Sequence, residues 1–270
     1  MKRFAFYLCC LFAVSCTCGN ESVYQQHLIR IDEALERADE YVNMKQQKIS
    51  TIENMLNSRG VTPLQQYHIY RQLFIEYQPF QFDKAKETLE RQLVIAKQIA
   101  SDSLQHCTML DMAMLHTTAG FYLEADEIFA QIDTASLTLD QKVYWYDARQ
   151  KFLHDYQEYV TTSSIEVPDA SQITRYQDRI LEITSDDIPL NRHIRILRII
   201  ESRDFEKAYE ENMAFIASLD KTSRDYAVQT YWQGYICENL DRTEELIKWW
   251  TESALCDIQG AIKDNASLCS

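Results

Sequence analysis

Proline and glycine are scarce in this chain: four prolines and five glycines occur among 270 residues. Tight turns between strands depend on these two residues, because glycine adopts positive φ and proline interrupts regular structure. Their scarcity argues against a protein built from many short strands and favours long helices joined by short turns. We therefore predict an all-α fold.

Motifs for catalysis and phosphate binding are missing. The sequence contains no HExxH, no glycine-rich phosphate loop and no GxSxG, the patterns that carry metal-assisted, phosphoryl and acyl chemistry. The cluster that comes nearest to a metal site is His106, Cys107, Asp111 and His116, but a continuous helix would turn its two histidines about 80° apart. We predict no catalytic residue, no cofactor and no metal, and hence a protein that is not an enzyme.

Positive charge is also in deficit, with 27 Lys and Arg against 41 Asp and Glu and a net charge of −14. Phosphate backbones are bound by basic patches. This balance predicts no direct contact with nucleic acid.

The long apolar run of the chain lies at its N-terminus. Lys2 and Arg3 precede an apolar stretch over residues 4–14, which is shorter than the roughly 20 residues that a membrane-spanning helix needs. This arrangement is typical of a signal peptide. Ala13-Val14-Ser15-Cys16 resembles a bacterial lipobox, in which the cysteine is lipidated and becomes the new N-terminus. Lipidation at Cys16, ordinary cleavage and an uncleaved anchor are the alternatives, and we favour lipidation.

The chain is divided by these signals into five segments. We predict a signal peptide (1–15), a short tether (16–24), a long N-terminal helix (25–60), a helical-repeat domain (61–262) and a tail (263–270). The expected location is the periplasm, with a membrane anchor provided by lipid.

The long N-terminal helix is predicted from an apolar stripe with spacings of three and four. Its positions are Leu28, Ile31, Leu35, Ala38, Val42, Lys45, Ile49, Ile52 and Leu56. Such a stripe is consistent with a dimeric coiled coil through residues 28–56, or with a helix that packs on its own chain. We favour the second alternative, because a lysine and an alanine in the stripe weaken a zipper.

Four later segments share one pattern: FDKAKETLERQLVIAKQI, GFYLEADEIFAQID, RDFEKAYEENMAFIAS and DRTEELIKWWTESAL. Each places a small or apolar residue early in a helix, and these anchors are Ala85, Ala125, Ala208 and Leu246. The gap between the second and third anchors is about twice the others, which predicts a degraded unit between Leu139 and Thr184. The pattern resembles the tetratricopeptide repeat, which favours glycine at the position of Gly234. We predict a tetratricopeptide-like superhelix of about five helix pairs.

The order of the pieces resembles a Bacteroidetes family of exported helical-repeat proteins of unknown function. The resemblance covers IDEALERADEYVNMKQQKIS, YHIYRQLFIEYQPFQFDKAKETLERQLVIAKQI and the C-terminal SRDYAVQTYWQGYICENLDRTEELIKWWTESALCDIQGAIKDNASL. Members of that family usually form the outer half of membrane-anchored transcriptional regulators. The resemblance therefore implies a sensory role as an alternative function.

Aromatic residues crowd the last repeat. In repeats of this kind the first helix of each pair lines the concave face. Arg224, Gln229, Tyr231 and Tyr235 would then contact a partner, whereas Trp250 would pack between the helices.

The sequence thus predicts a non-catalytic, exported binding or scaffold module that holds a peptide or protein in a helical-repeat groove. The alternative is the periplasmic sensor portion of a membrane-linked transcriptional regulator.

Overall fold

The computed structural model describes residues 21–160 and 171–262, and the regular structure of these residues is entirely α-helical. The helices are α2 (Glu21–Glu36), α3 (Ala38–Leu56), α4 (Pro63–Tyr77), α5 (Phe82–Gln98), α6 (Asp102–Thr118), α7 (Tyr122–Ala130), α8 (Leu139–Val160), α9 (Ser171–Ile183), α10 (Pro189–Glu201), α11 (Phe205–Ile216), α12 (Arg224–Asn239) and α13 (Thr243–Gln259). The all-α prediction is confirmed.

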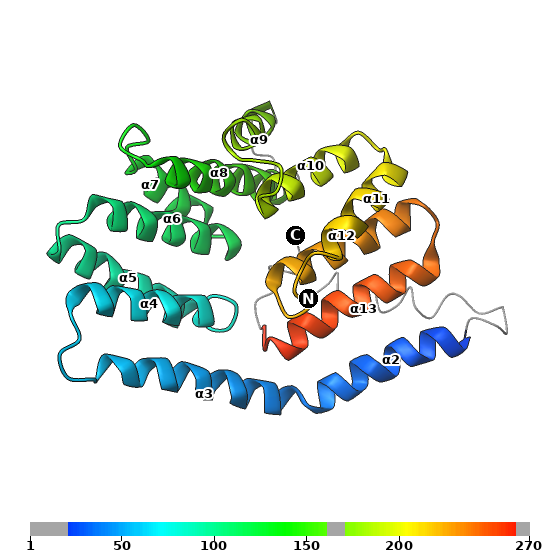
Figure 1. Ribbon diagram of the computed structural model, residues 1–270, viewed down its shortest axis with the longest axis horizontal. Helices are drawn as coiled ribbons and strands as arrows, with labels where there is room; N and C mark the ends of the chain where they lie inside the picture. Colours follow the sequence, from blue (N-terminus) through cyan, green and yellow to red (C-terminus); the bar gives the residue numbers. More distant parts are fainter. Residues whose placement is uncertain (1–20, 161–170, 263–270) are drawn as a thin grey trace.

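Ten of these helices form five consecutive pairs, α4–α5, α6–α7, α8–α9, α10–α11 and α12–α13 (Figure 1). This arrangement confirms the tetratricopeptide-like superhelix. The pair α8–α9 occupies the interval in which the anchor spacing predicted a degraded unit. A single pair cannot cover its own apolar side, and apolar clusters join α4–α5 to α6, α6–α7 to α8–α9, and α10–α11 to α12–α13.

The anchor residues lie where the two helices of a pair approach each other. Ala85, Ala125 and Ala208 are each fully buried, and Leu246 is half-buried. Small side chains at these positions let the helix backbones come close, which explains why the anchors recur at a fixed distance from each turn.

Three turns inside pairs share one geometry. Gly120, Arg203 and Asp241 each adopt a left-handed backbone, with φ of 80°, 61° and 56°. In the first of these turns, the N–H of Phe121 donates to the carbonyl of His116 at 2.8 Å, the closure expected at a helix C-terminus. Arginine and aspartate therefore take positions that glycine usually occupies, and this is how a chain with few glycines makes its turns.

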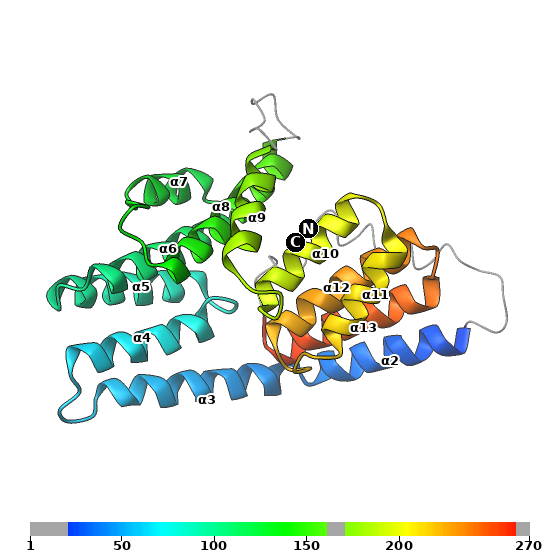
Figure 2. The same cartoon turned by 45° about the horizontal axis from the view of Figure 1, so that its top comes forward.

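The N-terminal region differs from the prediction of one long helix. It forms two helices, α2 and α3, which meet at Arg37, a residue with φ −96° and ψ 6°. The Arg37 guanidinium pairs with Glu40 at 2.8 Å and lies 5.2 Å from the centre of the Tyr41 ring. The helix bends because its two halves pack on different surfaces: α3 lies along α4, and α2 lies along α13 (Figure 1, Figure 2).

The α3 part of the N-terminal apolar stripe packs against another helix of the same chain. Ile49 and Ile52 are buried against α4, and the charged interruption, Lys45, pairs with Glu76 of α4 at 2.9 Å. The predicted signal peptide, Cys16 and the tail lie outside the described residues. Among the residues that are described, no helix has both the length and the apolar content needed to cross a bilayer.

Candidate functional site

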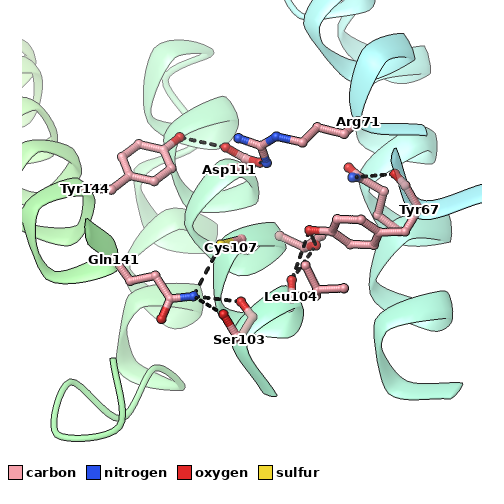
Figure 3. A network of polar contacts seen from close by, with 10 residues as sticks. Tyr67, Arg71, Ser103, Leu104, Cys107, Asp111, Gln141 and Tyr144 are labelled. Carbon is pink, nitrogen blue, oxygen red and sulfur yellow. Dashed lines mark hydrogen bonds and ion pairs between the residues drawn. The ribbon is translucent and has the colours of Figure 1, made fainter. Parts of the chain in front are cut away.

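A network of polar side chains joins the first helices of three successive pairs (Figure 3). Arg71 of α4 donates from Nη1 to Oδ2 of Asp111 on α6 at 2.8 Å. Tyr144 of α8 donates its hydroxyl to Oδ1 of the same carboxylate, also at 2.8 Å. One buried carboxylate thus ties three helices together through two charge-assisted hydrogen bonds.

A second row of contacts runs beside this one. The Tyr67 hydroxyl donates to the Leu104 carbonyl at 3.2 Å and lies 3.0 Å from Oγ1 of Thr108. From α8, Nε2 of Gln141 donates to the backbone carbonyl of Ser103 at 2.7 Å. Polar networks that are satisfied in this way fix the relative positions of the elements they join.

Burial sets the protonation of the central groups. Burial raises the pKa of Asp111, while Arg71 and Tyr144 act against that rise. Burial and the neighbouring carboxylate hold the pKa of Tyr144 well above its usual value of 10.0. Tyr144 therefore remains a hydroxyl donor at neutral pH, and the Arg71 side chain keeps 42% of its surface exposed. The network presents a positioned guanidinium to solvent.

An open hollow of about 420 Å³ lies between α3 and α4. Its lining residues are Lys48, Thr51, Ile52, Gln72, Ile75 and Glu76. Glu76 is 7% exposed and accepts from Nζ of Lys48 at 2.6 Å and from Nζ of Lys45 at 2.9 Å. Lys48 is in turn 64% exposed, so a buried carboxylate holds an exposed ammonium group at the edge of the hollow.

The structure separates the four residues predicted to bind a partner. Arg224 begins α12 and is exposed, and Tyr231 and Tyr235 are half-buried. Tyr235 packs edge-on against Phe205 with ring centres 6.3 Å apart. Gln229 is only 2% exposed.

The assignment of Gln229 to an open groove is therefore corrected. Its side-chain Nε2 lies 2.8 Å from Nδ1 of His193 on α10, so the amide has a polar partner inside the helix stack and is not presented to solvent. Burial lowers the pKa of His193, which keeps the imidazole neutral. Arg224, Tyr231 and Tyr235 remain predictions as contact residues.

Two of the four residues that came nearest to a metal site, Asp111 and His116, have other partners. Asp111 belongs to the network described above, and Nδ1 of His116 lies 2.7 Å from the carbonyl of Met112. Over residues 21–160 and 171–262, no three metal-ligating side chains form a group that could hold an ion.

The network centred on Asp111 is not among the features that the sequence predicts above, although two signals in the sequence point to it. Asp111 is a single acid inside the apolar run MLDMAML, where only a paired carboxylate is tolerated. Arg71 lies in YRQLFIEYQPF, a part of the segment on which the family resemblance rests. The pairing itself joins residues 40 positions apart, and periodicity carries no information about such a contact.

The five helix pairs define a helical-repeat domain of the tetratricopeptide type, a class that is generally non-catalytic and generally mediates contacts between proteins. Residues 35–270 match the model of the SusR N-terminal TPR domain, and the chain belongs to that family. A search of curated proteins found no match.

Proposed function

We propose that this chain is an exported, non-catalytic binding or scaffold module that holds a peptide or protein partner on its helical repeats. The observation that carries the proposal is the side-chain network that locks α4, α6 and α8 together and leaves the Arg71 guanidinium partly exposed. A surface whose parts are already fixed loses little conformational entropy when a partner binds.

The extent of the stack supports a macromolecular partner. Five pairs present side chains from successive first helices, and extended surfaces of this kind are what solenoid proteins use for binding. Half-buried aromatics such as Tyr231 and Tyr235 provide contact area with few rotamers to freeze.

The proposal is tested by replacing one residue of the chain at a time with a photoreactive phenylalanine and crosslinking in living cells. We expect polypeptide adducts at Tyr231 or Ile75, and none at Val94, an exposed residue of α5 that serves as the control. If none of the three positions yields a polypeptide adduct, the chain does not hold a protein partner and the proposal is wrong.

Export and lipid attachment belong to the same proposal and rest on the leader sequence. Labelled palmitate should enter the wild-type chain and fail to enter Cys16→Ala. Equal labelling of both would contradict lipidation at Cys16, and an intact N-terminus in the mature protein would contradict cleavage.

A second function, the sensor portion of a membrane-linked transcriptional regulator, is favoured by the family description, which names the domain as the N-terminal part of SusR. It predicts an in-frame membrane helix and a regulatory region downstream of codon 270. DNA sequence in which neither follows would contradict the sensor role and leave the scaffold role standing.

A further inference from the structure

One surface of the molecule combines exposed apolar side chains with basic ones. We call it the α3–α4 face and define it by Met44, Lys48, Thr51 and Met55 of α3 and by Leu64, His68, Gln72 and Ile75 of α4, all of which are exposed. Within each helix these residues are spaced by three or four, so each set forms a single stripe. The stripes border one another, because Lys48, Thr51, Gln72 and Ile75 line the same hollow.

Among residues 21–160 and 171–262, no element covers the apolar part of this face. Met44, Met55, Leu64 and Ile75 are 59%, 43%, 48% and 56% exposed. Large apolar side chains that gather on a monomer surface commonly mark a binding site. The hollow of about 420 Å³ lies in the middle of the α3 stripe, with Ile52 in its floor and Ile75 at its side.

The charge of the face is opposite to that of the chain. The net charge of the whole sequence is −14, yet the α3–α4 face has no acidic member. Glu76, the carboxylate that lines the hollow, is buried and bound by both Lys45 and Lys48. Lys48 stands in the stripe, and the exposed Arg59 follows in the turn after α3. Exposed cations attract acidic groups of a partner over a range of about 10 Å in 0.1 M salt.

We propose that the α3–α4 face binds an amphipathic helix of a partner protein, with the apolar stripe of that helix in the hollow and carboxylates flanking it. This inference rests on the proposed function and names the chemistry of the partner.

The dimensions of the face agree with a helical occupant. The stripe from Met44 to Met55 extends about 17 Å along α3, or about three helical turns. Two parallel stripes of side chains form a groove into which a third helix fits its own ridge. Glutamate or aspartate beside that ridge would reach Lys48 on one side and Arg59 at the far end.

The experiment is a selection on the purified chain from a displayed library of helices of about 18 residues, or five turns, with randomised stripe and flanks. The expected result is enrichment of leucine-rich stripes with acidic flanks. The selected peptides should bind Ile75→Glu and Lys48→Gln at least about tenfold more weakly than wild type, a loss of about 1.4 kcal/mol. Val94→Glu, the matched surface variant on α5, should bind within twofold of wild type.

Thermal melting of Ile75→Glu should match that of wild type, because Ile75 is 56% exposed. Lys48→Gln removes one of the two partners of buried Glu76 and should melt lower than wild type, so its binding is compared at a temperature at which circular dichroism shows both chains folded. Enrichment of basic flanks, failure to enrich any helix, or equal binding to Ile75→Glu would overturn the proposal. A concentration-dependent dimer that Ile75→Glu abolishes would also overturn it, by making a second copy of the chain the occupant. A crosslink at Tyr231 without one at Ile75 would leave the proposed function intact and remove this inference alone.

Discussion

At the scale of single residues, two positions have little tolerance for change. Gly234 is buried on α12, and a Cβ built there would lie 2.2 Å from Cδ1 of Trp250 on α13. Trp250 also donates from its indole N–H to the carbonyl of Tyr231 at 3.3 Å. The tryptophan is therefore a helix-packing residue, in agreement with the role that its repeat position predicts. The other position is Glu76, whose carboxylate is buried beneath two lysines.

Gly234→Ala should destabilise the chain by about 3 kcal/mol, since the new methyl group must displace an indole held between two helices. Urea unfolding measures this loss. In a Trp250→Ala background the same glycine substitution should cost far less, because the clashing atoms are gone. An equal cost in both backgrounds would contradict the packing that we describe.

Glu76→Gln should lower stability by about 2 kcal/mol at neutral pH, because the lysines lose a buried charged acceptor. Burial acts to raise the pKa of Glu76, but hydrogen bonds from Lys48 and Lys45 hold it below its ordinary value of 4.5. A lowered folded-state pKa contributes stability above the unfolded pKa and loses it as the pH falls through the folded value.

The difference in unfolding free energy between wild type and Glu76→Gln should therefore stay constant well above pH 4.5, the ordinary pKa, and shrink as the pH falls through the lowered pKa of the folded state. Urea titrations at each pH provide the measurement, and Glu124→Gln, at an exposed position on α7, is the control. A difference that is independent of pH would rule out the charged pair.

At the scale of elements, the N-terminal stripe is divided between two roles. Ile49 is 5% exposed and Leu35 is 53% exposed, although both belong to the same apolar repeat in the sequence. The half on α3 forms core with α4, whereas Leu28 and Leu35 on α2 remain at the surface. The stripe is thus only partly a packing surface of the monomer.

Ile49→Ala should cost about 3 kcal/mol, because it leaves a cavity against α4, whereas Leu35→Ala should change stability by no more than about 0.5 kcal/mol. Chemical denaturation of both variants makes the comparison. The predicted alternative of a coiled-coil dimer through residues 28–56 would instead require sedimentation to show a dimer that Leu35→Ala weakens.

Tyr144→Phe isolates one contact of the network between α6 and α8. Removing the hydroxyl leaves Oδ1 of buried Asp111 without its donor, for an expected loss of about 2 kcal/mol. Tyr146→Phe, on the same helix, keeps the ring contacts with Trp145 and Tyr176 and should be nearly neutral. Equal melting temperatures for the two variants would show that the network does not hold the helices together.

At the scale of the whole molecule, the N-terminal helices α2 and α3 contact both ends of the repeat stack. The bent rod of α2 and α3 lies along the last helix, α13, and along the first repeat helix, α4 (Figure 1). Nη2 of Arg30 on α2 lies 2.8 Å from Oε1 of Glu252 on α13. Terminal repeats of a solenoid need a cap over their open side, and α2 caps the last pair in this chain.

Deletion of α2 should therefore destabilise the last pair more than the middle of the stack. Hydrogen exchange should quicken in α12 and α13, with α6 far less affected, since opening is local when a cap is lost. Uniform protection across the stack after the deletion would contradict the capping role.

The sequence by itself determined the helical class, the number of pairs and the buried anchors. These properties follow from local spacing: an apolar residue every three or four positions specifies which face of a helix is buried, and Ala85, Ala125 and Ala208 mark the places where helices approach. Local spacing is enough because each unit repeats the same packing problem.

Tertiary structure alone decided the bend at Arg37, the burial of Gln229 and the partners of Asp111. These features depend on contacts between residues far apart in the chain. The periodicity around Gln229 is compatible with a groove or with the helix interior, and it is His193 of α10 that makes the interior polar enough to receive an amide. The bend, the burial and the pairing each depend on many small packing and solvation free energies contributed by elements far apart in the chain. A short stretch of sequence does not determine their total.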